Sequence, residues 1–309
     1  MDDHALFANW NIAFKTKCPE VDIAGSPNRS VARFVFTDEI GKRYIAEKFS
    51  YNKKNKQIRQ NIFLEYIAAS GFDAVKPWLR TAGDAHGVDA DDGFWQIRPF
   101  VDADPLPRKT LAFEESYREA WKRVLLKLKE LSGREDAPEP PNARFFFSLY
   151  VPTLIDFIHG KMADIAHELI DLMPEFDRFF TAEADLPTAL AHGDFHPGNI
   201  LLDHGKLSAV IDWEFLGRKV AGYDLALLTG CLGMDDPSWL VNGAAATLRS
   251  ELKNSDYLPG EAAEYFPDLI AATRLGWLGE WVDLNDHEMA EREIYFLKLL
   301  FFNRKNLLF

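Results

Sequence analysis

Residues 190–215 read L-A-H-G-D-F-H-P-G-N-I-L-L-D-H-G-K-L-S-A-V-I-D-W-E-F. An apolar lead-in reaches His192, and glycine and proline break the loop that follows it. Two apolar runs, at 200–202 and 207–211, flank a polar turn at 203–206. The pattern therefore predicts a loop followed by a β-hairpin.

The predicted hairpin brings three oxygen-bearing side chains toward one volume. It folds the chain back so that Asn199, at its start, lies near Asp212, at its end, with Asp194 on the loop just before. Mg²⁺ takes oxygen ligands, usually one or two of them from protein carboxylates. We therefore expect Asn199 and Asp212 to hold a magnesium ion, and Asp194 to orient a hydroxyl group and accept its proton.

The same residues resemble a known catalytic loop. His192, Asp194 and Asn199 keep the spacing of the protein-kinase pattern H-R-D-L-x-x-x-N, and Asp212 begins D-W-E where D-F-G would stand. The motifs H-G-D-x-H-P-G-N and I-D-W-E are similar to those of the aminoglycoside phosphotransferase and choline kinase family, in the protein-kinase-like superfamily.

This resemblance implies an α+β, two-lobed protein-kinase-like fold. Residues 1–100 would form a nucleotide-binding lobe, an antiparallel sheet with one helix, and residues 101–309 a mainly helical lobe for catalysis and substrate binding. ATP and Mg²⁺ are the implied cofactors. His192 and Asp224 are the implied structural supports of the site, with the Asp224 carboxylate bracing the catalytic loop through hydrogen bonds. Alternatively, Asp224 serves only as a carboxylate at a helix N-terminus.

Two other interpretations of the loop stay open. His192, Asp194 and His196 alternate along it, so an extended backbone could turn all three toward a transition metal, as in a metallohydrolase. That interpretation leaves the spacing of Asn199 and Asp212 unexplained. The plainest alternative is an ordinary loop and polar hairpin without chemistry.

Composition favours a small-molecule enzyme. A chain of 309 residues with 47% hydrophobic and 27% charged residues is long enough for two lobes with their own cores. The formal net charge of −13 disfavours nucleic acid or an anionic membrane as a partner and favours a cationic small substrate. The composition and motifs do not indicate an oligomeric state.

Cysteine use and the absence of targeting signals predict a cytoplasmic protein. The two cysteines, Cys18 and Cys231, are far apart and form no C-x-x-C pair, which is typical of a reduced compartment. The amino terminus lacks the basic and apolar parts of a signal peptide. No uncharged apolar run approaches the roughly 20 residues that a membrane span needs.

The amino-terminal third carries the expected nucleotide site. Strands are predicted at 21–24, 31–37 and 43–49, and the turn at 25–30 could lie over a triphosphate. Only Gly25 there permits close approach of the backbone, so a plain hairpin turn is an equal alternative.

Lys48 is the expected phosphate ligand. Ala46 and Lys48 share a strand face, as do the alanine and lysine of the kinase V-A-I-K motif, so that Ala46 would leave room for adenine. On a helix predicted at 57–69, Glu65 interrupts an apolar stripe, and the resemblance implies an ion pair between Glu65 and Lys48. The alternatives are a solvated lysine and a glutamate at the wet edge of the stripe.

Two further strands are predicted at 78–82 and 94–100, followed by a proline-punctuated connector. The resemblance makes residues 98–101 the hinge whose backbone binds the adenine edge, with Phe100 at its centre. Backbone contacts of this kind leave no mark on the side-chain pattern.

The remaining chain is predicted to be helical. Helices are expected at 113–131 and 145–158, and an apolar stripe then continues until Pro174 stops it. In a helix at 271–284, Trp277 and Trp281 lie on one face with Glu280 close by. Aromatic rings with a carboxylate can bind an ammonium group, although such stripes more often pack a core.

The sequence after Asp212 favours a small acceptor. Protein kinases carry an activation segment ending in A-P-E, which docks protein substrates, and that motif is absent here. The predicted function is an ATP-dependent kinase that moves the γ-phosphate to a hydroxyl of a small molecule, such as an amino alcohol or aminoglycoside. A homoserine- or sugar-type kinase and a catalytically silent nucleotide-binding regulator are the alternatives. The motifs identify neither the acceptor nor a preference for ATP over GTP.

Overall fold

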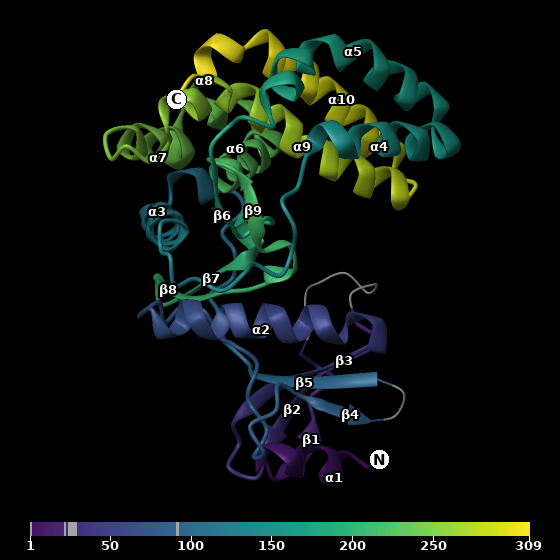
Figure 1. Cartoon of the computed structure of the whole chain (residues 1–309), viewed down its shortest axis with the longest axis vertical. Coiled ribbons are helices and arrows are strands. Elements are labelled where there is room, and N and C mark those ends of the chain that lie inside the picture. The colour runs from purple at the N-terminus through teal and green to yellow at the C-terminus, as the bar shows by residue number, and fades with distance from the viewer. Residues whose placement is uncertain (1, 22, 24–29, 91–92) are drawn as a thin grey trace.

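The computed structural model describes residues 2–21, 23, 30–90 and 93–309. The predicted strand at 21–24 and turn at 25–30 fall mostly outside these ranges. Figure 1 shows two lobes, a β-sheet with its flanking helices and a larger helical lobe, which confirms the predicted α+β architecture.

The first lobe is an antiparallel sheet with strand order β1-β2-β3-β5-β4. Its strands are β1 (Phe14–Lys17), β2 (Ala32–Asp38), β3 (Arg43–Phe49), β4 (Val88–Ala90) and β5 (Gly93–Pro99). The strands predicted at 31–37 and 43–49 agree closely with β2 and β3, but β1 was not predicted from the sequence. The strand predicted at 78–82 is wrong, because Leu79 N–H bonds Ile97 O whereas Thr81 N–H turns back to Ala85 O.

The two faces of this sheet pack against different helices. On one face, Phe36 stacks at 4.2 Å on Phe7 of α1 (Asp3–Phe7), and Ala46 is fully buried in the same apolar cluster. The other face turns to α2 (Lys54–Ala69): Phe49 meets Trp78 edge-on, and Asn61 of α2 bonds both the N–H and the carbonyl of Trp78. Figure 1 accordingly shows α2 between the sheet and the helical lobe, and α1 on the far side.

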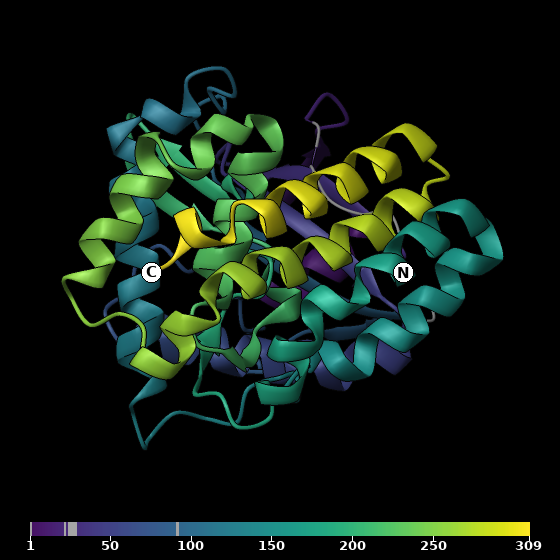
Figure 2. The same cartoon turned by 90° about the horizontal axis from the view of Figure 1, so that it is seen from above.

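The second lobe is built mainly from helices. They are α3 (Glu115–Ser132), α4 (Phe147–Lys161), α5 (Ala163–Ala182), α6 (Tyr223–Asp235), α7 (Gly243–Lys253), α8 (Gly260–Glu264), α9 (Phe266–Asp283) and α10 (His287–Phe302). Figure 2 shows α9 and α10, in yellow-green and yellow, side by side. None of the helices in the described ranges combines the length and apolar character needed to cross a membrane.

Pro174 does not end a helix, contrary to prediction, and α5 continues through it to Ala182. Proline removes the hydrogen bond to the carbonyl four residues earlier, that of Ile170. Ile170 is 44% exposed, so water can bond that carbonyl instead. The following turns bury Phe176 and Phe179 completely, and this burial favours the continued helix.

Two small sheets join the lobes. Strand β6 (Thr188–Ala191) pairs with β9 (Gly217–Val220), and β7 (Ile200–Asp203) pairs with β8 (Lys206–Val210). The predicted hairpin is the second of these pairs. The loop at 192–199 connects the two sheets, and Figure 1 shows them between α2 and the helices above.

Packing on the α1 side of the sheet generates a stability prediction. Ala46 is completely buried among aromatic rings, so Ala46→Leu should overpack this cluster and lower the free energy of unfolding by about 1–3 kcal/mol. Urea denaturation measures the change. Ile40→Leu, in an exposed turn, is the control and should change little. A fully stable Ala46→Leu protein would contradict the packing.

Candidate active site

The carboxylate of Asp224 holds the start of the loop. Its Oδ2 accepts the N–H of His192 at 2.7 Å and its Oδ1 accepts the N–H of Gly193 at 2.9 Å. Asp224 is buried in the first turn of α6, and burial raises its pKa to about 6 although both hydrogen bonds oppose the rise. These bonds attach residues 192 and 193 to the beginning of a rigid helix.

The His192 ring joins this loop to the segment that carries Asp212. Its Nδ1 accepts the N–H of Asp194 at 3.2 Å, so Nε2 carries the proton and donates to the carbonyl of Ile211 at 2.9 Å. The ring is fully buried, which lowers its pKa to about 4 and keeps it neutral. Both ring nitrogens are used, so the metallohydrolase interpretation is wrong for His192.

Asp194, Asn199 and Asp212 come together around this support. The N–H of Ile211 donates to Asn199 O at 3.0 Å, which sets Asp212 beside Asn199. The amide Nδ2 of Asn199 donates to Asp194 O at 2.8 Å and to Asp194 Oδ2 at 3.2 Å, so the amide oxygen points away from Asp194.

Asp212 has a left-handed backbone, with φ 69° and ψ 54°. An aspartate in this conformation stores strain that the surroundings must impose, and such strain gathers at functional sites. The oxygens of Asn199 and Asp212 are the hard donors that Mg²⁺ prefers, so the donor set fits this ion.

The sheet register places Lys48 away from this loop. Lys48 pairs with Ala32 and Trp95 and shares the α1 face with Ala46; a Cβ at Gly93 would lie 2.5 Å from its Cε. Because side chains alternate along a strand, Glu47 occupies the face turned to α2. This placement argues against the predicted roles of Lys48 with phosphates and of Ala46 with adenine.

Glu47 forms a charge cluster that the sequence did not predict. Its carboxylate is buried and lies 3.1 Å from Arg33 Nε on β2 and 3.4 Å from Arg98 Nη2 on β5. Arg98 also lies over the Trp78 ring at 4.7 Å. The sequence signal for this cluster is the alternation of side chains along β3. Alternation puts Glu47 and Lys48 on opposite faces, but it does not show which face meets α2.

Glu65 pairs with a different cation from the one predicted. Its carboxylate holds Arg80 in a bidentate pair, with Nε–Oε1 at 2.6 Å and Nη2–Oε2 at 2.7 Å. Among the described residues no ion pair joins Glu65 to Lys48, because Lys48 lies on the opposite face of the sheet. The predicted pair is therefore wrong.

Phe100 follows β5 at the expected hinge. Its N–H donates to Arg43 O at 3.0 Å, and the Arg43 guanidinium lies 4.7 Å from its ring centre. The ring packs with Val35 and Ile45, which lie on the same sheet face as Glu47. Phe100 thus lines the face turned to α2.

The two tryptophans of α9 have different contacts: Trp277 meets a residue of the loop, and Trp281 meets a buried ion pair. The Trp277 ring is 5.8 Å from that of His196, whose Nε2 is 3.8 Å from Asp194 Oδ2. Trp281 instead donates its Nε1–H to Glu293, the buried partner of Arg274. Glu280 is exposed on the same helix.

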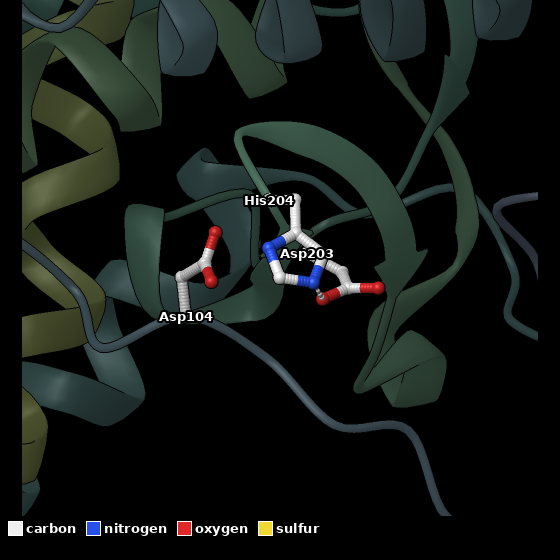
Figure 3. A group of neighbouring side chains, drawn as sticks. All are labelled: Asp104, Asp203 and His204. Atoms are coloured by element: carbon white, nitrogen blue, oxygen red, sulfur yellow. Dashed lines mark ion pairs between the residues drawn. The ribbon is translucent and has the colours of Figure 1, made fainter.

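A separate acidic cluster lies at the tip of the β7–β8 hairpin (Figure 3). The ligand atoms of Asp104, Asp203 and His204 lie within 4.8 Å of one another, and all three residues are exposed. Asp104 Oδ2 accepts the N–H of Gly205 at 3.0 Å, so its position is explained by bracing the turn. The hydrogen bond that holds this cluster goes to Gly205 of the hairpin turn, not to Asp194, Asn199 or Asp212.

Comparison with known proteins identifies a family that covers most of the chain. Residues 26–264 match the phosphotransferase enzyme family. A homoserine kinase of Chelativorans sp. is 30% identical over 129 residues, 39% of each chain. One of Gluconacetobacter diazotrophicus is 27% identical over 151 residues, 47% of this chain and 46% of the relative. The matched region thus spans less than half of these curated relatives.

Solved structures share the fold at low sequence identity. An aminoglycoside phosphotransferase from Alicyclobacillus acidocaldarius superposes with a TM-score of 0.62 at 17% identity, covering 99% of this chain and 96% of the other. A thermostable aminoglycoside phosphotransferase, in a ternary complex with ADP and hygromycin B, gives 0.65 at 14% identity and 96% of each chain. A spectinomycin phosphotransferase bound to ADP and its substrate gives 0.64 at 13% identity, covering 97% and 96%.

The conformation of Gly193 generates a second prediction. Its φ is +89°, and a Cβ there would lie 2.4 Å from the Phe215 carbonyl oxygen. Gly193→Ala should therefore lower the free energy of unfolding by about 2–4 kcal/mol, through left-handed strain and overpacking. Gly276→Ala in α9, where a Cβ meets no atom within 4 Å, is the control and should be neutral or stabilising. Equal stability of both variants in urea would contradict the close approach.

Burial of Asp224 generates a pH prediction. Its pKa in the folded protein, about 6, exceeds the ordinary 3.8, so the folded state binds this proton more tightly than the unfolded state. Its contribution to stability is then largest at low pH and is lost as the pH rises through 6. Relative to Asp224→Asn, the wild type should gain about 1 kcal/mol per pH unit from pH 6 to 4. Urea titrations along this range measure it, and a constant difference would contradict it.

Proposed function

Because this chain belongs to the phosphotransferase enzyme family, we propose that it transfers the γ-phosphate of ATP to a hydroxyl group of a small molecule. One observation carries the proposal: Asp194 and Asn199 are hydrogen-bonded to each other, beside Asp212, on a loop that Asp224 and His192 hold in place. Phosphoryl transfer depends mainly on positioning and charge stabilisation, which such a rigid cluster can supply.

Asp194 is the group we assign to the acceptor. Its carboxylate orients the attacking hydroxyl and accepts its proton as the new bond to phosphorus forms. The amide of Asn199 fixes this carboxylate through the bond to Oδ2. The buried, neutral His192 fixes the Asp194 backbone and does not compete for the proton.

Asn199 and Asp212 are the residues that would hold Mg²⁺. The ion would neutralise charge on the phosphates of the nucleotide. The imposed backbone of Asp212 directs its carboxylate from the end of β8 and so fixes one ligand in advance.

The nucleotide is proposed to lie against the sheet face turned to α2. The half-buried ring of Phe100, backed by the buried Val35 and Ile45, supplies an apolar surface there for the base. With Lys48 on the other face, Arg33 and Arg98 are the cations placed for the phosphates, and Glu47 orients both. An arginine suits this task because its planar guanidinium forms paired hydrogen bonds to phosphate oxygens.

The acceptor is proposed to enter beside Trp277, which contacts the loop through His196. The Trp277 ring and the exposed Glu280 carboxylate suit an ammonium group, whereas Trp281 acts as a support tied to Glu293. The similarity to homoserine kinases and the fold shared with aminoglycoside kinases both agree with a small amino-bearing alcohol.

Substitution of the base tests the proposal. Asp194→Asn should keep ATP affinity and lose about 100- to 10,000-fold in turnover, the usual contribution of a general base. ADP release measures turnover across amino alcohols, hydroxy amino acids, aminoglycosides and sugars. Asp203→Asn, an exposed carboxylate on the β7–β8 hairpin, is the matched control and should retain full turnover. Unchanged turnover in Asp194→Asn removes Asp194 from the mechanism, and lack of ATP binding by the wild type rejects the kinase.

A further inference from the structure

Lys219 on β9 is a buried cation that the proposed mechanism leaves unused. The residue is only 6% exposed, and its Nζ lies 4.8 Å from the ring centre of Tyr223 and 5.0 Å from that of Phe145. Within the described part of the chain, no oxygen acceptor lies within hydrogen-bond or ion-pair distance of this ammonium. Two aromatic faces offset only part of the cost of burying a charge.

The lysine lies directly beside the catalytic loop. A Cβ at Gly193 would be 2.8 Å from Lys219 Cε, so the lysine stem packs on the residue that precedes Asp194. Gly193 is the chain neighbour of Asp194, so Lys219 lies beside the loop that carries the proposed base. Asp224, an acid whose attraction acts on this lysine, already uses both oxygens for backbone N–H groups.

The Lys219 ammonium has charged groups near it but no direct partner among the described residues. Burial lowers its pKa to about 8; the attraction of Asp224 opposes this shift and exceeds the repulsion from Lys56 on α2. An anion placed against the ammonium would offset the cost of burying this charge.

We propose that Lys219 binds the carboxylate of the phosphate acceptor while the acceptor hydroxyl meets Asp194. This inference rests on the proposed function and narrows its substrate class to hydroxy amino acids. Trp277 and Glu280 would receive the ammonium group and Lys219 the carboxylate, so that the two ends of one zwitterion are held on two sides of the loop. An amino alcohol without the carboxylate would leave Lys219 unpaired.

Matched acceptors and one substitution test the proposal. L-homoserine and 3-aminopropan-1-ol differ only in the carboxylate, as do L-serine and ethanolamine. Lys219→Met keeps the unbranched stem, one atom shorter, and removes its charge. It should lower kcat/KM for the carboxylate-bearing member by about 10- to 100-fold, mainly through KM, and leave its amino alcohol and the KM for ATP unchanged. Lys206→Met, an exposed lysine on β8, is the control and should alter none of these values.

Thermal unfolding supplies a readout that needs no catalysis. Removing an unpaired buried charge should raise the Tm of Lys219→Met by about 2–4 °C. Without nucleotide, the carboxylate-bearing compound should raise the wild-type Tm more than its amino alcohol does, and this difference should vanish in Lys219→Met.

These outcomes separate the two proposals. If the wild type phosphorylates none of the four compounds, the proposed function fails for this class, whereas the ligand-dependent Tm shift still decides the anion site. A carboxylate effect that persists in Lys219→Met overturns the inference. A rise in the KM for ATP alone overturns it too, because the anion would then be a nucleotide phosphate. A lower Tm with equal losses for all acceptors assigns Lys219 to packing.

Discussion

The carboxylate of Asp224 is the constraint on which the rest of the site depends. It accepts the backbone N–H groups of His192 and Gly193 and so attaches the loop to the first turn of α6. From there the His192 ring reaches both Asp194 and Ile211, and the backbone of Ile211 reaches Asn199. One buried acid thus helps to set the relative positions of the three oxygen-bearing side chains Asp194, Asn199 and Asp212.

This arrangement lowers stability at the proposed active site. Asp224, His192 and Lys219 are all at least nine-tenths buried, and burial moves the pKa of each toward the neutral form. Asp212 adds a strained backbone. A core of apolar residues at these positions would be more stable, so their presence is best explained by function, as is usual for active sites. Helices α6 and α9, most of whose residues are buried, supply stability that offsets these costs.

In the sheet of the smaller lobe, the sequence did not determine which face of β3 meets α2. Both faces of β3 are apolar enough to pack, so Ala46 and Lys48 could be assigned to either side until α1 and α2 were placed. Neighbouring side chains of a strand lie on opposite faces, so the choice of face determines whether Lys48 or Glu47 lies toward α2. With Lys48 on the far face, Glu65 pairs with Arg80 instead. Arg80 lies in an irregular segment, and no periodic pattern in the sequence marks it as a partner.

Local spacing and periodicity were enough to predict the loop and hairpin at 190–215 and most helices, and the resemblance of the loop motifs to a known family implied the two-lobed class. Asp194, Asn199 and Asp212 could be selected for the same reason, since one short hairpin brings them together. The tertiary structure alone decided the facing of β3, the contact between Trp277 and His196, and the aromatic surroundings of Lys219. These contacts join segments distant in sequence, and only the packing of whole elements determines which side chains meet.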